Sequence, residues 1–93
     1  MTVRDNPEQS RYEITVDGQL AGFVVYRDGG DTLTMVHTEV DPEWEGQGVG
    51  SALVKEALDD VRARGLEIRP TCPFVAEYVK RHPEYGDLVS SAS

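Results

Sequence analysis

The segment best suited to bind a ligand is Glu45-Gly46-Gln47-Gly48-Val49-Gly50-Ser51, in which glycine stands at every second position. Glycine has no Cβ, so the backbone N–H groups of such a segment can crowd together and approach a ligand closely. An apolar-periodic run from Ala52 to Val61 follows and predicts a helix that starts with unpaired N–H groups and a positive dipole end. This arrangement predicts an anion site, suited above all to phosphate. The alternative is a flexible turn that only caps the helix.

Cys72 is the main candidate for a reactive side chain. Pro73 fits the first position of a helix, which places Cys72 at or next to the N-cap. A helix N-terminus stabilises the thiolate form, so Cys72 could act as a nucleophile or give its proton to a leaving group. The alternative is a buried cysteine that behaves as a small hydrophobic residue.

His37 could serve as a base, because imidazole can accept a proton near neutral pH. Alternation along the strand-like run Thr32–Val40 places four residues on one face: Leu33, Met35, His37 and Glu39. His37 is then predicted to stand on one wall of a crevice that Cys72 closes from the neighbouring strand, because adjacent strands lie about 4.8 Å apart. The alternative is a core histidine beneath a helix, and His82 is interpreted only as a helix-end residue.

The strands that must position these residues form a predicted three-stranded antiparallel meander. Arg11–Val16 alternates in polarity, Asp17-Gly18 predicts a tight hairpin, and Gln19–Tyr26 supplies the partner strand. A second hairpin through Gly29-Gly30 leads into Thr32–Val40.

The rest of the chain predicts a crossover unit and a last helix. A helix from Gly48 to Arg64 is followed by the short strand Leu66–Thr71, which is expected to run parallel to the third strand of the meander. Pro70 cannot donate a ladder hydrogen bond, so the two parallel strands should separate near it. The last helix begins at Pro73, ends before Pro83, and has an apolar face made of Phe74, Val75, Tyr78 and Val79. The fold class is therefore α+β.

Size and charge restrict the functions that fit. The 93 residues predict a single domain, 1–93, with an ordered core of about residues 10–88 and frayed ends at Met1–Gln9 and Ser90–Ser93. A net charge of −8 argues against nucleic acid as a partner, yet backbone N–H groups can still hold a phosphate-bearing cofactor. One cysteine and two histidines are too few for a zinc site, and no apolar run is long enough for a membrane span. We therefore expect a cytoplasmic protein without metal, membrane or nucleic-acid partners.

The order of elements and several motifs resemble the GNAT superfamily of acetyl-coenzyme A-dependent N-acetyltransferases. The signature of that family is Gln or Arg, two residues, Gly, one residue, then Gly or Ala; Gly48 and Gly50 match it, and Glu45 replaces the Gln or Arg. The chain is most similar to the small, minimal members, which share the run His37-Thr38-Glu39-Val40, the glycine loop and a cysteine after the last strand, here Cys72. The likeness extends from about Tyr12 to Tyr85.

This resemblance implies a minimal GNAT-like fold that binds acetyl-coenzyme A, with the pantetheine arm between Thr32–Val40 and Leu66–Thr71 and the pyrophosphate on the glycine loop. The implied cofactor contacts are Thr38, Glu39, Val40, Gly46, Gln47, Gly48, Val49, Gly50, Ser51 and Tyr78. Tyr78 is interpreted first as a core residue and only second as a coenzyme A contact. Cys72 would carry the acetyl group or protonate the leaving thiolate, and His37 would be base to Cys72 or to the incoming amine.

The acceptor and the oligomeric state stay open. Full-length members have early helices and a last strand pair that shape the acceptor pocket, and both are missing here, so the amine could belong to a small molecule or to a protein. The competing hypothesis is a non-catalytic acyl-coenzyme A-binding module or sensor. A short chain with an exposed edge strand is compatible with a monomer or a dimer.

Overall fold

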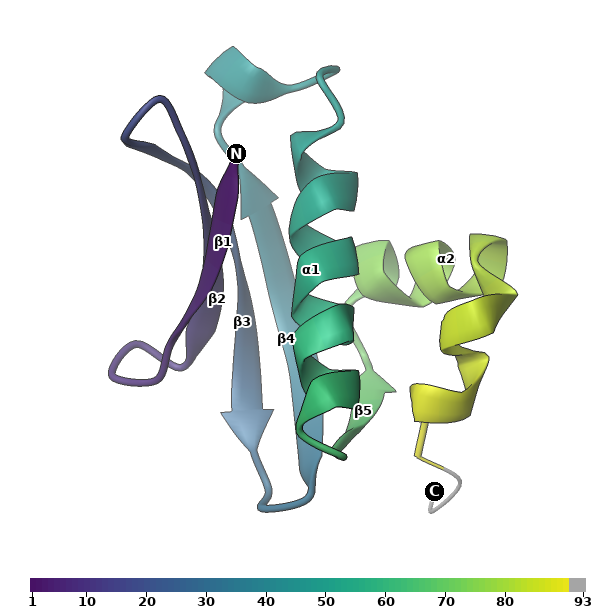
Figure 1. Ribbon diagram of the computed structural model, residues 1–93. Helices are drawn as coiled ribbons and strands as arrows, with labels where there is room; N and C mark the ends of the chain where they lie inside the picture. Colours follow the sequence, from purple (N-terminus) through teal and green to yellow (C-terminus); the bar gives the residue numbers. More distant parts are fainter. Residues whose placement is uncertain (91–93) are drawn as a thin grey trace.

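In the computed structural model, which describes residues 1–90, five strands form one sheet in the order β1-β2-β3-β4-β5 (Figure 1). The strands are β1 Thr2–Asn6, β2 Arg11–Val16, β3 Gln19–Asp28, β4 Thr32–Val40 and β5 Glu67–Pro70. The first four strands are antiparallel in sequence order, and β5 runs parallel to β4. The predicted α+β class, the meander and the parallel last strand are confirmed, and the sheet has one antiparallel strand more than predicted.

The additional strand is β1, so the prediction that Met1–Gln9 frays is wrong. Asp5 of β1 accepts hydrogen bonds from the Tyr26 hydroxyl at 2.6 Å and from Arg64 Nη2 at 2.8 Å. The polar composition of residues 1–9 was misleading because an edge strand needs little apolar surface. In β1, Val3 provides that surface by packing against the core. At the other end, the Ser90 N–H donates to the Ile68 carbonyl at 2.8 Å. Residues 91–93, also expected to fray, lie outside the described part of the chain.

Two α-helices and two short 3-10 helices complete the fold. Helix α1 Val49–Ala63 lies across one face of the sheet and α2 Pro73–Arg81 lies beside β5, with η1 Pro42–Trp44 and η2 Pro83–Leu88 after β4 and α2 (Figure 1). Left-handed glycines bound α1, with φ of +75° at Gly48 and +70° at Gly65. The predicted helix limits were therefore off by one residue at each end.

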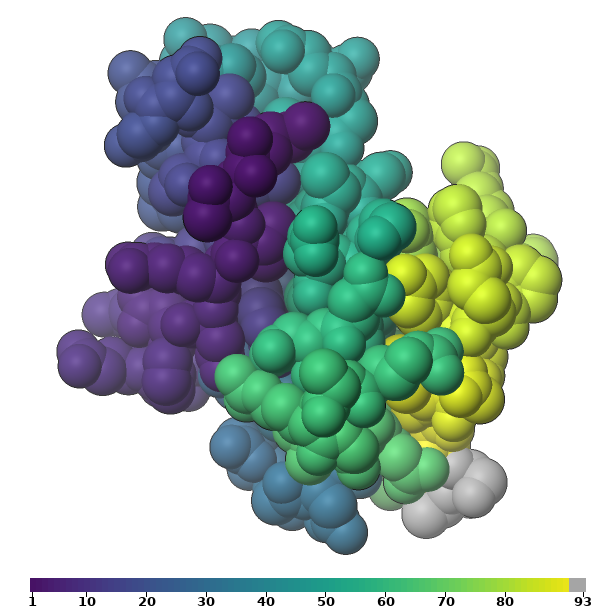
Figure 2. Space-filling view, in the orientation of Figure 1, coloured from purple at the N-terminus to yellow at the C-terminus, as the bar shows by residue number. Residues whose placement is uncertain are grey.

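The core lies between α1 and the sheet. Its largest fully buried side chains include Tyr12, Ile14, Leu33, Met35, Leu53, Leu58 and Ile68. The C-terminal segment packs on the other flank of α1, as Figure 2 shows, where the Tyr85 hydroxyl donates to Asp59 at 2.6 Å and Arg62 pairs with Asp87 at 2.9 Å. Helix α1 is thus held by its apolar face and by hydrogen bonds to segments far away in sequence.

Strand β4 contains one extra residue opposite β3. Val25 pairs with His37 and the next residue, Tyr26, pairs with Met35, so Val36 is a β-bulge. Beyond the bulge the alternation is inverted: Thr38 pairs with the buried Val24 on the α1 face, and His37 lies on the opposite face. The predicted common face is therefore correct for Leu33 and Met35 and wrong for His37 and Glu39.

Strands β4 and β5 separate where the sequence predicted. Their parallel pairing ends at Met35 and Pro70. The Met35 carbonyl then accepts hydrogen bonds from the Cys72 N–H at 2.9 Å and the Thr71 hydroxyl at 2.8 Å, which hold the chain as it leaves the sheet. Within residues 1–90, the part of β4 from Val36 to Val40 has no strand partner on the β5 side. This open edge is the frame of the candidate site.

Candidate functional site

The glycine loop leads into α1 through backbone conformations that favour glycine. Gly46 and Gly48 have φ of +80° and +75°, and Gly48 is the N-cap of α1. No side chain in the described part of the chain caps this end, and the first turn of α1 holds no acidic residue. The first N–H groups of α1 and the positive end of its dipole are therefore available to an anion. Among the predicted contacts, the side chain of Val49 points into the core, so only its backbone could contribute.

A cleft of about 370 Å³ runs between this loop, the open edge of β4 and the start of α2. Its lining residues are Thr38, Val40, Glu45, Gly48, Gly50, Ser51 and Phe74. The cleft is thus lined both by the glycine loop and by the Thr38 side chain. We call it the donor cleft.

Cys72 lies at the Thr38 end of the donor cleft. It is the N-cap of α2, with Pro73 at the first helical position, as predicted. Its thiol makes no capping bond; instead Sγ lies 3.2 Å from Thr38 Oγ1 in a hydrogen bond. The residue is 3% exposed and does not itself line the cleft; its neighbour Thr38 does.

His37 does not join Cys72. Its imidazole lies on the outer face of the sheet, with Nε2 3.2 Å from Glu39 Oε1, and more than half of each side chain is exposed. Thr38 takes the position beside the thiol that the sequence had assigned to His37. The physical reason is the bulge at Val36, which turns every following side chain of β4 to the other face.

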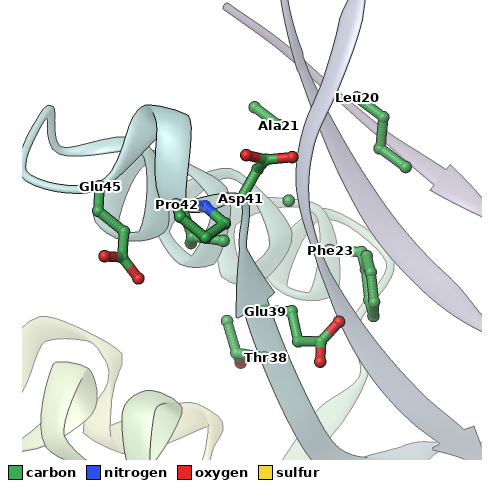
Figure 3. Close-up of a pocket in the computed structure, with 10 residues that line it drawn as sticks. Leu20, Ala21, Phe23, Thr38, Glu39, Asp41, Pro42 and Glu45 are labelled. Atoms are coloured by element: carbon green, nitrogen blue, oxygen red, sulfur yellow. The ribbon is translucent and has the colours of Figure 1, made fainter.

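A second pocket, of about 560 Å³, lies at the end of β4 (Figure 3). It is lined by Leu20, Ala21, Gly22, Phe23, Thr38, Glu39, Val40, Asp41, Pro42 and Glu45. Three of these are carboxylates, and Figure 3 shows Glu39 next to the ring of Phe23 on the neighbouring strand. We call this the acidic pocket. The Asp41 carboxylate also has a structural role, because it caps η1 by accepting a hydrogen bond from the Glu43 N–H at 3.0 Å.

The two hollows meet along β4. Thr38, Val40 and Glu45 line both of them, so a ligand in the donor cleft and one in the acidic pocket would be separated only by the end of this strand. The two hollows are therefore neighbours at the end of β4. This geometry suits the transfer of a group between two bound molecules.

Tyr78 belongs to the core, which was its first interpretation. Its ring stacks on His82 with centroids 4.1 Å apart, and it lines neither the donor cleft nor the acidic pocket. Burial raises the pKa of Tyr78, so its phenol keeps its proton. His82 is half-exposed at the end of α2, as expected for a helix-end residue.

Sequence reasoning missed several residues that line the two hollows. Phe74 was assigned to the apolar face of α2 but lines the donor cleft and is 42% exposed. In the acidic pocket, the residues not predicted as part of a site are Leu20, Ala21, Gly22, Phe23, Asp41 and Pro42. For Asp41 the available signal was the following Pro42, because Asp is favoured at the N-cap and Pro at the first helical position.

Residues 1–90 contain no group of His, Cys, Asp or Glu that could hold a metal ion. No helix in the same range is long and apolar enough to cross a membrane.

Comparison with known families decides what this architecture is. The family model described as GCN5-related N-acetyltransferase matches residues 11–88. The chain belongs to this family. Its members use acetyl-coenzyme A as the acetyl donor, and the resemblance inferred from the glycine loop and the order of elements is confirmed.

Known relatives are similar over different parts of the chain. The [ribosomal protein bS18]-alanine N-acetyltransferase of Escherichia coli K12 is 31% identical over 55 residues, which cover 59% of this chain and 37% of that enzyme. Protein NATD1 of Danio rerio is 27% identical over 93 residues, covering 96% of this chain and 84% of that protein. The matched segment thus spans little more than a third of the E. coli GNAT enzyme and most of the fish protein.

Solved structures show the same fold. A GCN5-like protein from Staphylococcus aureus superposes with a TM-score of 0.72 at 22% identity, covering 99% of this chain and 90% of the other. The E. coli ribosomal-protein-S18-alanine N-acetyltransferase superposes with a TM-score of 0.64 at 23% identity, covering 77% and 50%. At these identities the likeness concerns the GNAT fold alone.

Proposed function

We propose that this protein transfers an acetyl group from acetyl-coenzyme A to an amine, with the coenzyme in the donor cleft and the amine in the acidic pocket. The observation that carries the proposal is the shared wall of the two hollows, made of Thr38, Val40 and Glu45. A donor site and an acceptor site that meet at one strand end allow direct contact between the reacting groups.

The donor cleft fits coenzyme A at both ends. Gly46 and Gly48 have no side chain, and the uncapped start of α1 offers N–H groups to a pyrophosphate. The open edge of β4 offers backbone groups to the amide-containing pantetheine arm. When bound, the cofactor would supply an activated acetyl thioester. Gln47, Ser51 and the N–H of Val49 are the remaining loop groups proposed to contact it.

Cys72 is proposed as the residue that handles the acetyl group or the leaving thiolate. In the covalent route, Sγ bonds to the acetyl carbon and its proton goes to the departing thiolate; the amine then takes the acetyl group, and its proton restores the thiol. In the direct route, the amine attacks the acetyl carbon, the bond from that carbon to the coenzyme A sulfur breaks, and Cys72 donates its proton to the departing thiolate and regains one from the acylated amine. Thr38, at 3.2 Å, would orient the thiol in both routes.

The acidic pocket supports an amine as the acceptor. Glu39, Asp41 and Glu45 attract an ammonium group, and Leu20 and Phe23 offer apolar surface to its carbon chain. An ammonium group must lose a proton before it attacks. His37, paired with Glu39 at 3.2 Å beside the pocket, is proposed to accept that proton.

The test is calorimetric titration of the purified protein with acetyl-coenzyme A, followed by intact mass measurement and turnover with a primary amine. Cys72→Ala should keep cofactor binding and lower turnover about 100-fold or more. An acetyl adduct on the wild-type protein that disappears in Cys72→Ala supports the covalent route. Turnover that is unchanged in the variant contradicts a role for Cys72 in either route and leaves only direct transfer without help from this residue. Absence of binding contradicts the proposed function.

A second candidate is a non-catalytic acyl-coenzyme A-binding module. It is favoured by the burial of Cys72 and by the short span relative to the E. coli enzyme. Tight binding of acetyl-coenzyme A without turnover over a panel of small amines and peptide N-termini would support it.

A further inference from the structure

Phe74 is exposed, unlike the large apolar residues of α2 that pack in the core. Val75 and Tyr78 are buried, whereas Phe74, in the first turn, is 42% exposed. Its ring crosses to α1: a Cβ built on Gly50 would lie 2.7 Å from Phe74 Cζ and 3.3 Å from Phe74 Cε2. The same Cβ would lie 3.3 Å from Val40 Cγ2 of β4. The ring therefore rests on the start of α1, in the space that a side chain at position 50 would need.

The backbone of Gly50 gives no other reason for glycine. Its φ is not in the left-handed region, unlike that of Gly46 and Gly48, and it lies inside the first turn of α1. Alanine is a much better helix former than glycine at such a position. The ring of Phe74 thus gives position 50 a packing reason for glycine, in addition to the approach of the glycine loop to a ligand.

We propose that Phe74 is the apolar wall of the donor cleft that contacts the pantetheine arm, and that Gly50 has no side chain in order to seat this ring. The identity of the ligand rests on the proposed function. Phe74 stands two residues after Cys72 and touches the glycine loop, so its ring lies between the proposed phosphate end and the thiol end of the cleft. The pantetheine arm is the part of the cofactor that spans this interval, and its methyl and methylene groups would cover the exposed ring.

The binding test compares two probes, coenzyme A and adenosine 3′,5′-bisphosphate, which lacks the pantetheine arm. Phe74→Ala should weaken coenzyme A binding about tenfold, since apolar contact with the arm is lost, and leave the affinity for the bisphosphate unchanged. Phe74→Leu, which keeps an apolar side chain, should lose less. Leu20→Ala, which removes an apolar side chain of similar exposure in the acidic pocket, is the matched control and should bind coenzyme A as the wild type does.

Two binding results overturn the inference. One is a Phe74→Ala variant that binds coenzyme A like the wild type, and the other is an equal loss for both probes, which would mean general damage to the cleft. A wild-type protein that binds neither probe contradicts the proposed function itself, and the pantetheine contact with it.

The seat of the ring can be tested without any ligand. Gly50→Ala should lower the melting temperature by about 4 °C in the wild type, where the new methyl group meets the ring. In a Phe74→Ala background the same substitution should lower it clearly less or raise it, because only the 3.3 Å contact with Val40 Cγ2 then opposes the better helix propensity. Gly86→Ala, with no atom within 4 Å of the added Cβ, is the control in both backgrounds. An equal shift from Gly50→Ala in the two backgrounds would show that Phe74 does not explain the glycine. Melting of Phe74→Leu with and without Gly50→Ala gives the same comparison if Phe74→Ala fails to fold.

Discussion

Three carboxylates, those of Glu39, Asp41 and Glu45, set the chemical character of the acidic pocket. They have different structural partners: Asp41 caps η1, and Glu39 pairs with His37 on the outer face of β4. Glu45 stands where the family signature has Gln or Arg, and it lines both hollows. Glu39 is therefore the carboxylate that can be neutralised with least damage to the fold.

Glu39→Gln should lower kcat/KM for a primary amine about tenfold, a loss of about 1.4 kcal/mol, because one attractive charge and the partner of His37 are removed. The melting temperature should change little, since the side chain is exposed. Steady-state kinetics with the amine varied measure the effect. Glu43→Gln has the same change in net charge at a residue that lines neither hollow, and an equal effect in both variants would contradict a local role for Glu39.

At the residue scale, the sequence predicted the loop and the cysteine better than the base. Gly46 and Gly48 adopt the left-handed conformations that favour glycine, and Cys72 is the N-cap that Pro73 indicated. These predictions depend on local rules. Which residue contacts Cys72 depends on strand register, and local rules do not determine register. The hydrogen bond between Thr38 and Cys72 was therefore found only in the structure. The catalytic roles of Cys72 and His37 stay predictions.

At the scale of elements, α1 connects the two halves of the molecule. Its start faces the donor cleft, while its second half bonds to the rest of the protein through Tyr12 with Asp60 and Tyr85 with Asp59, each at 2.6 Å. The hydrogen bond from Tyr85 is the largest cause that lowers the pKa of Asp59 below its ordinary 3.8; burial opposes the shift and Lys55 reinforces it. The hydrogen bond that holds η2 against α1 therefore depends on the protonation state of Asp59.

This linkage gives a predicted acid dependence. Because the pKa of Asp59 is lower in the folded protein than in the unfolded chain, the folded state binds fewer protons, and its contribution to stability is present above the ordinary value and lost as pH falls through the lowered pKa. Tyr85→Phe should cost about 1 kcal/mol near neutral pH. That difference should shrink as pH falls below the ordinary 3.8 and through the lowered pKa of Asp59.

Urea unfolding of both proteins across this pH range measures the difference. Tyr78→Phe is the control. Tyr78 also packs in the core, next to Tyr85, and within residues 1–90 its hydroxyl makes no hydrogen bond. A difference between Tyr85→Phe and the wild type that stays constant with pH would contradict the linkage.

Most elements could be predicted because their signals are local. The hairpin at Asp17-Gly18 has both residues at positive φ, 52° and 78°, as the dipeptide indicated. Pro70 marked the end of the parallel ladder. Strand β1 and the bulge at Val36 were missed, since a polar edge strand and one extra residue leave no periodic pattern.

At the scale of the whole molecule, the net charge of −8 acts on the two ligands with opposite sign. Coenzyme A is an anion, so a protein of this charge repels it at long range, and under the proposed function the start of α1 would attract it locally. A cationic amine is attracted both by the whole protein and by the acidic pocket.

Added salt should therefore tighten coenzyme A binding and lower kcat/KM for a cationic amine. The Debye length falls from about 30 Å at 0.01 M to about 3 Å at 1 M, which removes the long-range part of both effects. Calorimetry and steady-state kinetics in a sodium chloride series measure the two trends. Parallel trends would mean that the amine does not bind as a cation near the carboxylates.

The bulge at Val36 reverses which face of the sheet the odd-numbered side chains of β4 occupy. Odd-numbered side chains face α1 up to Met35 and face solvent from His37 onward. A substitution along this strand changes one side chain, but the insertion or deletion of one residue between Met35 and Val40 would turn every following side chain of β4 to the opposite face of the sheet. In this strand, chain length is as much a determinant of the site as residue type.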